Sequence, residues 1–401
     1  MSTSILYHAF GIRGVKHCRT RFEQGEIIFE AVMTEALAIC PVCGSRDVIY
    51  RGARVRGLQM VPIGSKRVWL DLTVHRLGCR ACGAIRWPHL PFADPRRTVT
   101  HAFERFVVER LRHMTIASCA HCLRAGWDRI KDIHKRALTR QYRNIPLADV
   151  CAVAIDEFAV HKGHESMTIV LDLATGRILH ATPGKSAAAV TPFLRVLARK
   201  APNLRAVAMD MSPAYIAAVT EHLPHVDIVV DHWHVMALAN CAIEECRRGQ
   251  QAELDRLGQK TLKGCRFLLL RNYEDLPAKK KARLDRLLKV NEPVLIMHTM
   301  KEQLRTFWQY FTQRSAASFL SAWCRDAMES CIPPLMRLGR TLLFHRPFLL
   351  NYFPHGITSG MIEGIVNKIK TLKRQAYGFR DDQSFTLRLY HLHRQRYSLS
   401  G

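Results

Sequence analysis

The chain has 401 residues, and its 60 lysines and arginines outnumber its 34 aspartates and glutamates to give a formal charge of +26. This length predicts two or three compact domains, and an apolar content of 48% argues against a disordered chain. No run reaches the roughly 18 to 20 apolar residues that cross a bilayer, and the N-terminus lacks the pattern of a signal peptide. We therefore expect a soluble cytosolic protein without membrane association, whose positive charge faces a polyanion, with nucleic acid as the first candidate.

Half of the excess charge lies in about a quarter of the chain. Residues 40–150 hold 21 basic and 8 acidic residues, a net +13. This concentration indicates a nucleic-acid-binding segment, although a generally basic, solvated surface would give the same charge.

Two Cys-x-x-Cys pairs lie in this basic segment. Cys40 and Cys43 form the first pair, Cys79 and Cys82 form the second, and a glycine follows each pair at once. Thiolates at this spacing can bind one tetrahedral ion, and glycine lets the backbone reverse beneath the metal. Between the pairs, residues 66–77 alternate in part between apolar and polar side chains, as a strand does. We predict a zinc ribbon in which the four cysteines hold a structural zinc ion.

The next stretch, residues 100–142, has helical periodicity. Thr115 and the residues after it can cap a short helix, Gly126 breaks the pattern, and an amphipathic basic helix follows. Helix, glycine-containing turn and basic helix outline a helix-turn-helix, whose second helix enters the major groove of DNA. A solvated basic hairpin is the alternative. The side chains expected to contact DNA are Arg124, Arg129, Lys131, Lys135 and Arg136.

A third cysteine pair, Cys119 and Cys122, lies within this helical stretch. With His113 and His121 it could bind a second metal, but no fourth ligand has a convincing spacing. We interpret the pair as ordinary core cysteines of the helices.

After Pro146 the chain takes on an α/β pattern. Strands are expected at 150–160, 166–173, 177–182, 204–210 and 226–233, and helices at 186–200 and 213–223. Residues 234–355 read as almost wholly helical, and a further helix covers 359–375.

Three acidic residues stand at unusual places in this pattern. Asp156 interrupts the first strand, Asp210 ends another, and Glu363 lies in the first turns of the late helix. A charge at the tip of a buried strand is costly without compensation, and together these carboxylates could form an oxygen-rich cage for Mg²⁺. Each acid alone could equally be a strand-end cap or a solvated residue. Asp231, which also ends a strand and precedes His234 by three residues, competes for the second place.

The order of the motifs resembles that of insertion-sequence transposases of the ISL-three family. The resemblance rests on CPVCG, the second Cys-x-x-Cys, the helix-turn-helix, AIDEFAVHKGH, VAMDMSPAY, VVDHWHV and SGMIEGIVNKIKTLKRQAYGFR, and spans about residues 40–393. These transposases belong to the DDE class, with a ribonuclease-H-like catalytic fold.

The resemblance implies a role for each matching residue. The catalytic triad falls on Asp156, Asp210 and Glu363, which would hold two Mg²⁺ or Mn²⁺ ions. Asp231 and His234 take an accessory role in this match. Asn367 and Lys370 follow Glu363 on one face of its helix, suited to gripping the DNA backbone.

The expected domains are an N-terminal segment, a zinc ribbon, a helix-turn-helix domain, and a DDE catalytic domain with a helical insertion at about 235–355. Their ranges are 1–39, 40–95, 96–145 and 146–401. The expected activity is binding of the terminal inverted repeats of an insertion sequence, followed by metal-dependent cleavage and strand transfer into target DNA, without a covalent protein intermediate. Because two ends must be held together, we expect a homo-oligomer that associates with the bacterial nucleoid when bound to DNA. A non-catalytic DNA-binding regulator and a structure-selective nuclease on the same fold remain alternatives.

Overall fold

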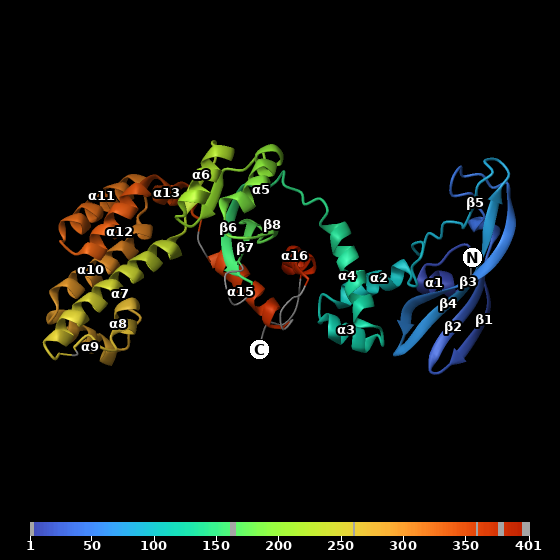
Figure 1. Cartoon of the computed structure of the whole chain (residues 1–401), viewed down its shortest axis with the longest axis horizontal. Coiled ribbons are helices and arrows are strands. Elements are labelled where there is room, and N and C mark those ends of the chain that lie inside the picture. Colours follow the sequence, from blue (N-terminus) through green and yellow to red (C-terminus); the bar gives the residue numbers. More distant parts are fainter. Residues whose placement is uncertain (1–3, 161–165, 260, 358–359, 376–380, 395–401) are drawn as a thin grey trace. The chain divides into compact units, whose positions relative to one another are not determined.

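The computed structural model describes residues 4–160, 166–259, 261–357, 360–375 and 381–394 (Figure 1). The chain forms two compact units. The first joins residues 1–144 to residues 371–401, and the second comprises residues 145–370.

None of the described helices combines the length and the apolar character that crossing a bilayer requires.

A five-stranded sheet begins the first unit. After helix α1 (Ile5–Phe10) come β1 (Val15–Glu23), β2 (Glu26–Met33), β3 (Val48–Ile63), β4 (Lys66–Cys79) and β5 (Ile85–Arg86). The strand order is β1-β2-β4-β3, with β5 paired to β4; β2 runs parallel to β4 and the other pairs are antiparallel. Alternate residues of β2 are buried, as expected when one face of a strand packs on a core. The strand expected at 66–77 is confirmed as β4.

Three helices follow, as the sequence predicts. They are α2 (His101–Arg110), α3 (Ile116–Cys122) and α4 (Trp127–Gln141). The Thr115 side chain accepts a hydrogen bond from the Ser118 N–H and so caps α3. The turn before α4 differs from expectation in one detail. Arg124 adopts the left-handed conformation, with φ of 46°, whereas Gly126 is extended and precedes α4.

The sheet of the second unit has the order β10-β9-β6-β7-β8. Its strands are β6 (Ala152–Ala159), β7 (Ser166–Asp172), β8 (Ile178–Pro183), β9 (Ala206–Met209) and β10 (Asp227–Val230). β6, β7 and β8 form an antiparallel meander, and β9 and β10 run parallel to β6. This is the expected ribonuclease-H-like arrangement. Helices α5 (Ala187–Lys200) and α6 (Pro213–His222) pack through apolar side chains on one face of the sheet (Figure 1).

The strand expected at 226–233 ends earlier than the sequence suggested. β10 stops at Val230, and helix α7 begins at His232. The reason is local: the Asp231 carboxylate accepts a hydrogen bond from the Trp233 N–H and caps α7.

The helical insertion is confirmed and has its own core. Trp323 is buried in this core and donates from Nε1 to the Met300 carbonyl at 2.9 Å, while Trp308 packs half-buried against the core. The helices are α7 (His232–Arg256), α8 (Arg266–Leu270), α9 (Ala278–Lys289), α10 (Glu292–Arg305), α11 (Gln313–Glu329), α12 (Pro333–Phe344), α13 (Arg346–Leu350) and α14 (Tyr352–His355).

Two helices close the described chain, α15 (Gly360–Gln375) and α16 (Asp382–His391). The structure divides the chain differently from the expected domains in two places. Residues 1–39 supply two strands to the ribbon sheet rather than a separate segment, because β2 pairs with β4. The chain after Lys370 belongs to the first unit, where α16 packs against α4.

Candidate functional site

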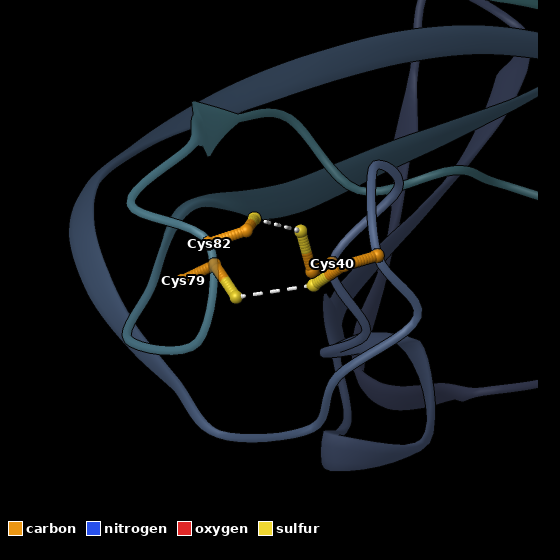
Figure 2. A group of neighbouring side chains, drawn as sticks. Cys40, Cys79 and Cys82 are labelled. Atoms are coloured by element: carbon orange, nitrogen blue, oxygen red, sulfur yellow. Dashed lines mark hydrogen bonds between the residues drawn. The ribbon is translucent and has the colours of Figure 1, made fainter.

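The four cysteines of the two Cys-x-x-Cys pairs meet in one place. Their sulfur atoms all lie within 4.8 Å of one another; the sulfurs of Cys40 and Cys82 are 3.7 Å apart and those of Cys43 and Cys79 are 3.5 Å apart. Figure 2 shows the sulfurs of Cys40, Cys79 and Cys82 turned toward one another. A tetrahedral zinc ion with Zn–S bonds of about 2.3 Å places its sulfurs about 3.8 Å apart. The observed spacing therefore fits zinc.

Each Cys-x-x-Cys pair with its following glycine forms a turn, called here a zinc knuckle, whose backbone N–H groups act on the thiols. In each pair the following glycine donates its N–H to the carbonyl of the first cysteine at 3.0 Å and has a positive φ, 75° for Gly44 and 70° for Gly83. The N–H groups of Cys43 and Val42 lower the pKa of the Cys40 thiol to about 6. For Cys43, the Ser45 N–H lowers the pKa, but contacts with Cys82 and Cys79 outweigh it and raise the pKa to about 12. Four thiols this close cannot all ionise without a cation among them.

Only one cysteine of the third pair belongs to the core of the helices, whereas both were expected there. Cys119 is fully buried among the apolar side chains of α2, α3 and α4, and burial raises its pKa to about 11. Cys122, one turn later, is exposed.

The five cations expected to contact DNA differ in their surroundings. Arg124 and Arg129 are exposed, although Arg129 also donates to the Gln59 side chain at 3.1 Å. Lys131 and Lys135 both pair with Asp381, at 3.1 and 3.0 Å. The fifth, Arg136, is three-quarters buried and pairs with the carboxylates of Glu104, Asp132 and Asp94.

Helix α16 therefore covers one face of α4. Besides the Asp381 pairs, the Tyr142 hydroxyl and His391 Nδ1 lie 2.9 Å apart, and the His134 ring contacts that of His391 edge-on. His134 is buried at this interface. Because α4 also packs on α2 and α3, only the part of its surface that these helices and α16 leave uncovered is open to a ligand in the described structure.

Asp156, Asp210 and Asp231 lie level with one another at one edge of the second sheet. Ala152 of β6 pairs with Ala206 of β9, which pairs with Asp227 of β10, and each of the three aspartates stands four residues further along its own strand direction. Side chains alternate between faces along a strand, so Asp156 lies on the face opposite to that packed by α5 and α6.

A nearby backbone N–H fixes one oxygen of each aspartate. Asp156 accepts from the Glu157 N–H at 2.7 Å, Asp210 from the Ser212 N–H at 3.1 Å, and Asp231 from the Trp233 N–H at 3.2 Å. The second oxygen of Asp231 lies 3.8 Å from His234 Nε2. Among the described residues, none makes a hydrogen bond or ion pair to the second oxygen of Asp156 or Asp210.

The electrostatics at this edge suit a divalent cation. Burial raises the pKa of Asp156; the Glu157 N–H and His234 oppose this shift, and the carboxylates of Asp231 and Asp210 add to it. Like charges gathered at a partly buried site are relieved by a cation, and carboxylate oxygens are the ligands that Mg²⁺ and Mn²⁺ prefer. The donor set thus fits such an ion. Within the described ranges, only the four cysteines already have three or more ligand atoms within 4.8 Å of one another.

The late glutamate is presented by α15. Glu363, Asn367 and Lys370 are exposed, while a stripe of apolar residues on the same helix is buried. Met361 and Ile365 lie close to Gly176 in the turn between β7 and β8, which holds α15 against the sheet. Residues 161–164 of the first motif, and residues 359 and 376–380 of the last, lie outside the described residues.

Sequence reasoning missed two groups at these sites. Asp381 follows the pattern of a helix cap, since its side chain accepts the Ser384 N–H, but no sequence signal links it to Lys131 and Lys135. Glu157 follows Asp156 on a regular strand, so its side chain points to the opposite face, where it accepts a hydrogen bond from the Tyr215 hydroxyl at 2.7 Å.

Comparison with known families gives three matches in chain order. A zinc-finger of transposase IS204/IS1001/IS1096/IS1165 matches residues 36–82, a helix-turn-helix domain of transposase family ISL3 matches 88–138, and an ISL3 transposase DDE domain matches 153–389.

Individual relatives agree with these matches. The chain is 31% identical over 360 residues to the transposase for insertion sequence element IS1001 of Bordetella parapertussis, covering 89% of each chain. It is 26% identical to the transposase for IS1557 of Mycobacterium tuberculosis, covering 86% of this chain and 83% of the relative. A Drosophila P element transposase strand transfer complex aligns over 74% of this chain and 92% of that chain with 11% identity and a TM-score of 0.35, too weak a likeness to establish a shared fold. Given its family matches and its relatives, the chain belongs to the ISL3 family of insertion-sequence transposases.

Proposed function

We propose that this transposase binds the terminal inverted repeats of an insertion sequence and catalyses metal-dependent DNA cleavage and strand transfer. The observation that carries the proposal is the row of aspartates at the edge of the second sheet. There the carboxylates of Asp210 and Asp231 contribute to the raised pKa of Asp156. A transposase that only bound DNA would have no need to gather carboxylates at a partly buried sheet edge.

In this proposal Asp156, Asp210 and Glu363 are the catalytic acids and hold two Mg²⁺ or Mn²⁺ ions. Such ions supply activation of an attacking oxygen and stabilisation of a leaving oxygen at a phosphodiester. Asp156 and Asp210 each keep one oxygen oriented by a backbone N–H and the other available for a ligand. Asp231 caps α7 and neighbours His234, so we assign this pair a supporting role.

Donors for DNA come from two places. On α15, Asn367 and Lys370 share the exposed side of the helix with Glu363 and would hold the phosphodiester backbone. Of the five cations expected to contact DNA, Arg124 and Arg129 are the exposed ones and would contact the transposon ends first. Lys131, Lys135 and Arg136 would have to exchange an acidic partner for phosphate.

The test uses the full chain, Mg²⁺ and a DNA fragment that carries a transposon end. Substitutions D156N, D210N and E363Q should each abolish cleavage while leaving end binding within about twofold. The matched control is D326N, which removes an exposed carboxylate from α11 and should change neither property. Retained cleavage in any of the three variants would contradict that residue's assignment.

The comparison between Asp210 and Asp231 decides the second acid. We expect D231N to keep measurable cleavage, because the second oxygen of Asp231 lies beside His234, whereas the second oxygens of Asp156 and Asp210 are available for an ion. If D231N abolishes cleavage and D210N does not, the two assignments exchange.

The same assay separates the other functions considered. End binding without cleavage in the unaltered protein would favour a regulator, and equal cleavage of fragments with and without ends would favour a structure-selective nuclease. We also propose a homo-oligomer that holds two ends together. Light scattering of the end-bound protein tests this, and one chain per DNA end without pairing of ends would contradict it.

A further inference from the structure

A chain of polar groups centred on the buried side chains of Tyr215 and Thr168 lies on the helix-covered face of the second sheet, behind Asp156. The Tyr215 hydroxyl donates to Glu157 Oε1 at 2.7 Å and lies 3.0 Å from Thr168 Oγ1. Thr168 in turn donates to the Gly184 carbonyl at 2.8 Å. Tyr215 is 3% exposed and Thr168 is fully buried, so water cannot replace these contacts at low cost. We call these four residues the tyrosine bridge.

The tyrosine bridge joins the two elements that carry the proposed catalytic aspartates. Glu157 directly follows Asp156 on β6. Tyr215 lies in the first turns of α6, the helix that begins three residues after Asp210. The hydrogen bond between the two side chains therefore connects the backbone beside one aspartate to the helix just beyond the other.

This connection lies where the strand pairing stops. The parallel pairing of β6 with β9 runs from Ala152 and Ala206 to Ala154 and Ala208, two residues before Asp156 and Asp210. Beyond that point the sheet ladder no longer fixes the distance between the two strand tips. A hydrogen bond to a carboxylate is short and directional, and can fix that distance in place of the ladder.

We propose that Tyr215 is a positioning residue whose hydrogen bond to Glu157 sets the separation of Asp156 and Asp210, and with it the affinity of this edge for a divalent cation. This inference rests on the proposed function, in which the two aspartates share the ions. Residues that orient metal ligands from behind typically change metal affinity by about 10- to 100-fold when removed.

The primary measurement is the affinity of the full chain for Mn²⁺, determined by calorimetry. Y215F keeps the aromatic ring in the core and removes only the hydroxyl, so the fold is expected to persist. We expect Y215F to bind Mn²⁺ about 10-fold more weakly than the unaltered protein. The matched control is Y273F, which removes a tyrosine hydroxyl that donates to Asp285 at 3.2 Å in the helical insertion, and its Mn²⁺ affinity should be unchanged.

Variants of the acceptor sharpen the test. E157Q keeps an oxygen that can accept from Tyr215 and should retain most of the affinity, whereas E157A should weaken Mn²⁺ binding as Y215F does. Because both changes remove the same hydrogen bond, the double variant Y215F/E157A should be no weaker than either single one. In the cleavage assay, Y215F should need about 10-fold more Mg²⁺ yet reach a near-normal maximal rate.

The outcomes distinguish failure of the positioning role of Tyr215 from failure of the proposed metal-dependent cleavage. Unchanged Mn²⁺ affinity in Y215F, with D156N abolishing binding and cleavage, would overturn the role of Tyr215 and leave the proposed function standing. Loss of maximal rate without any change in metal requirement would also overturn it, because that result indicates a general packing defect. If D156N and D210N still bind Mn²⁺ and cleave, the proposed function itself fails.

Discussion

Removing the charge of Asp381 should loosen α16 from the helix-turn-helix. Its carboxylate accepts the Ser384 N–H at 2.9 Å and pairs with Lys131 and Lys135, so it both begins α16 and holds that helix to α4. D381N keeps the cap, since asparagine caps as well as aspartate, and removes only the ion pairs. D381A removes both contributions.

The magnitude follows from the exposure of the partners. The side chains of Asp381, Lys131 and Lys135 are 26%, 26% and 30% exposed, so water and salt screen both pairs. At about 0.2–1 kcal/mol for each pair, D381N should weaken the docking of α16 by about 0.4–2 kcal/mol. Loss of the cap in D381A should add about 1 kcal/mol.

Hydrogen exchange of the α16 amides in the full chain measures this docking directly, without requiring the two units to unfold together. At about 1.4 kcal/mol per tenfold, D381N should exchange roughly 2- to 30-fold faster. The control D382N makes the same change of net charge at an exposed position in the first turn of α16, and should stay within about twofold. High salt should reduce the difference between D381N and the unaltered protein.

The same two variants test the DNA-binding surface. If Lys131 and Lys135 reach phosphate once Asp381 is neutral, D381N should bind DNA more tightly than D382N, with a steeper dependence on salt. Exchange in D381N equal to that in D382N would refute the ion-pair reasoning. Faster exchange with equal DNA binding would show that α16 stays docked over this face of α4 when DNA binds.

Two further predictions concern the zinc knuckles and buried histidines. C82S should lower the zinc content from one per chain, whereas C18S, at an exposed cysteine on β1, should not; mass spectrometry checks both, and the sheet should persist because its core consists of apolar side chains other than the four cysteines. Equal zinc in both variants would contradict the four-cysteine site. Burial, with a smaller contribution from Lys301, lowers the pKa of His298 to about 4, and burial, with Arg388 and His391, lowers that of His134 to about 3. Because the pKa of each histidine is below the usual 6.5 in the folded protein, the unfolded chain binds protons more readily in acid. The free energy of unfolding is therefore highest above pH 6.5 and falls by about 1.4 kcal/mol per pH unit for each histidine as the solution is acidified. Thermal unfolding between pH 7 and 5 should show this decline in the helical insertion, and a H298N variant that keeps the full decline there would contradict the role of His298.

Much of the fold was predictable because its signals are local. The cysteine spacing predicted the knuckles, the alternation of residues 66–77 predicted β4, and helical periodicity predicted α2 to α4 and the insertion. The end of β10 was misplaced because a run of apolar residues does not reveal that the next aspartate caps a helix.

The order of residues along the chain already specifies the functional groups that are present, namely four thiols at metal-binding spacing, cations on an amphipathic helix, and acids at strand ends. Which of these groups meet depends on the folded arrangement of the strands and helices. Lys135 and Asp381 are 246 positions apart, and the tyrosine bridge joins residues 58 positions apart across a sheet. Spacing along the chain fixes contacts within a turn, a helix or a strand, but contacts over such separations follow from strand order and helix packing, which bring distant residues together through burial of the shared core.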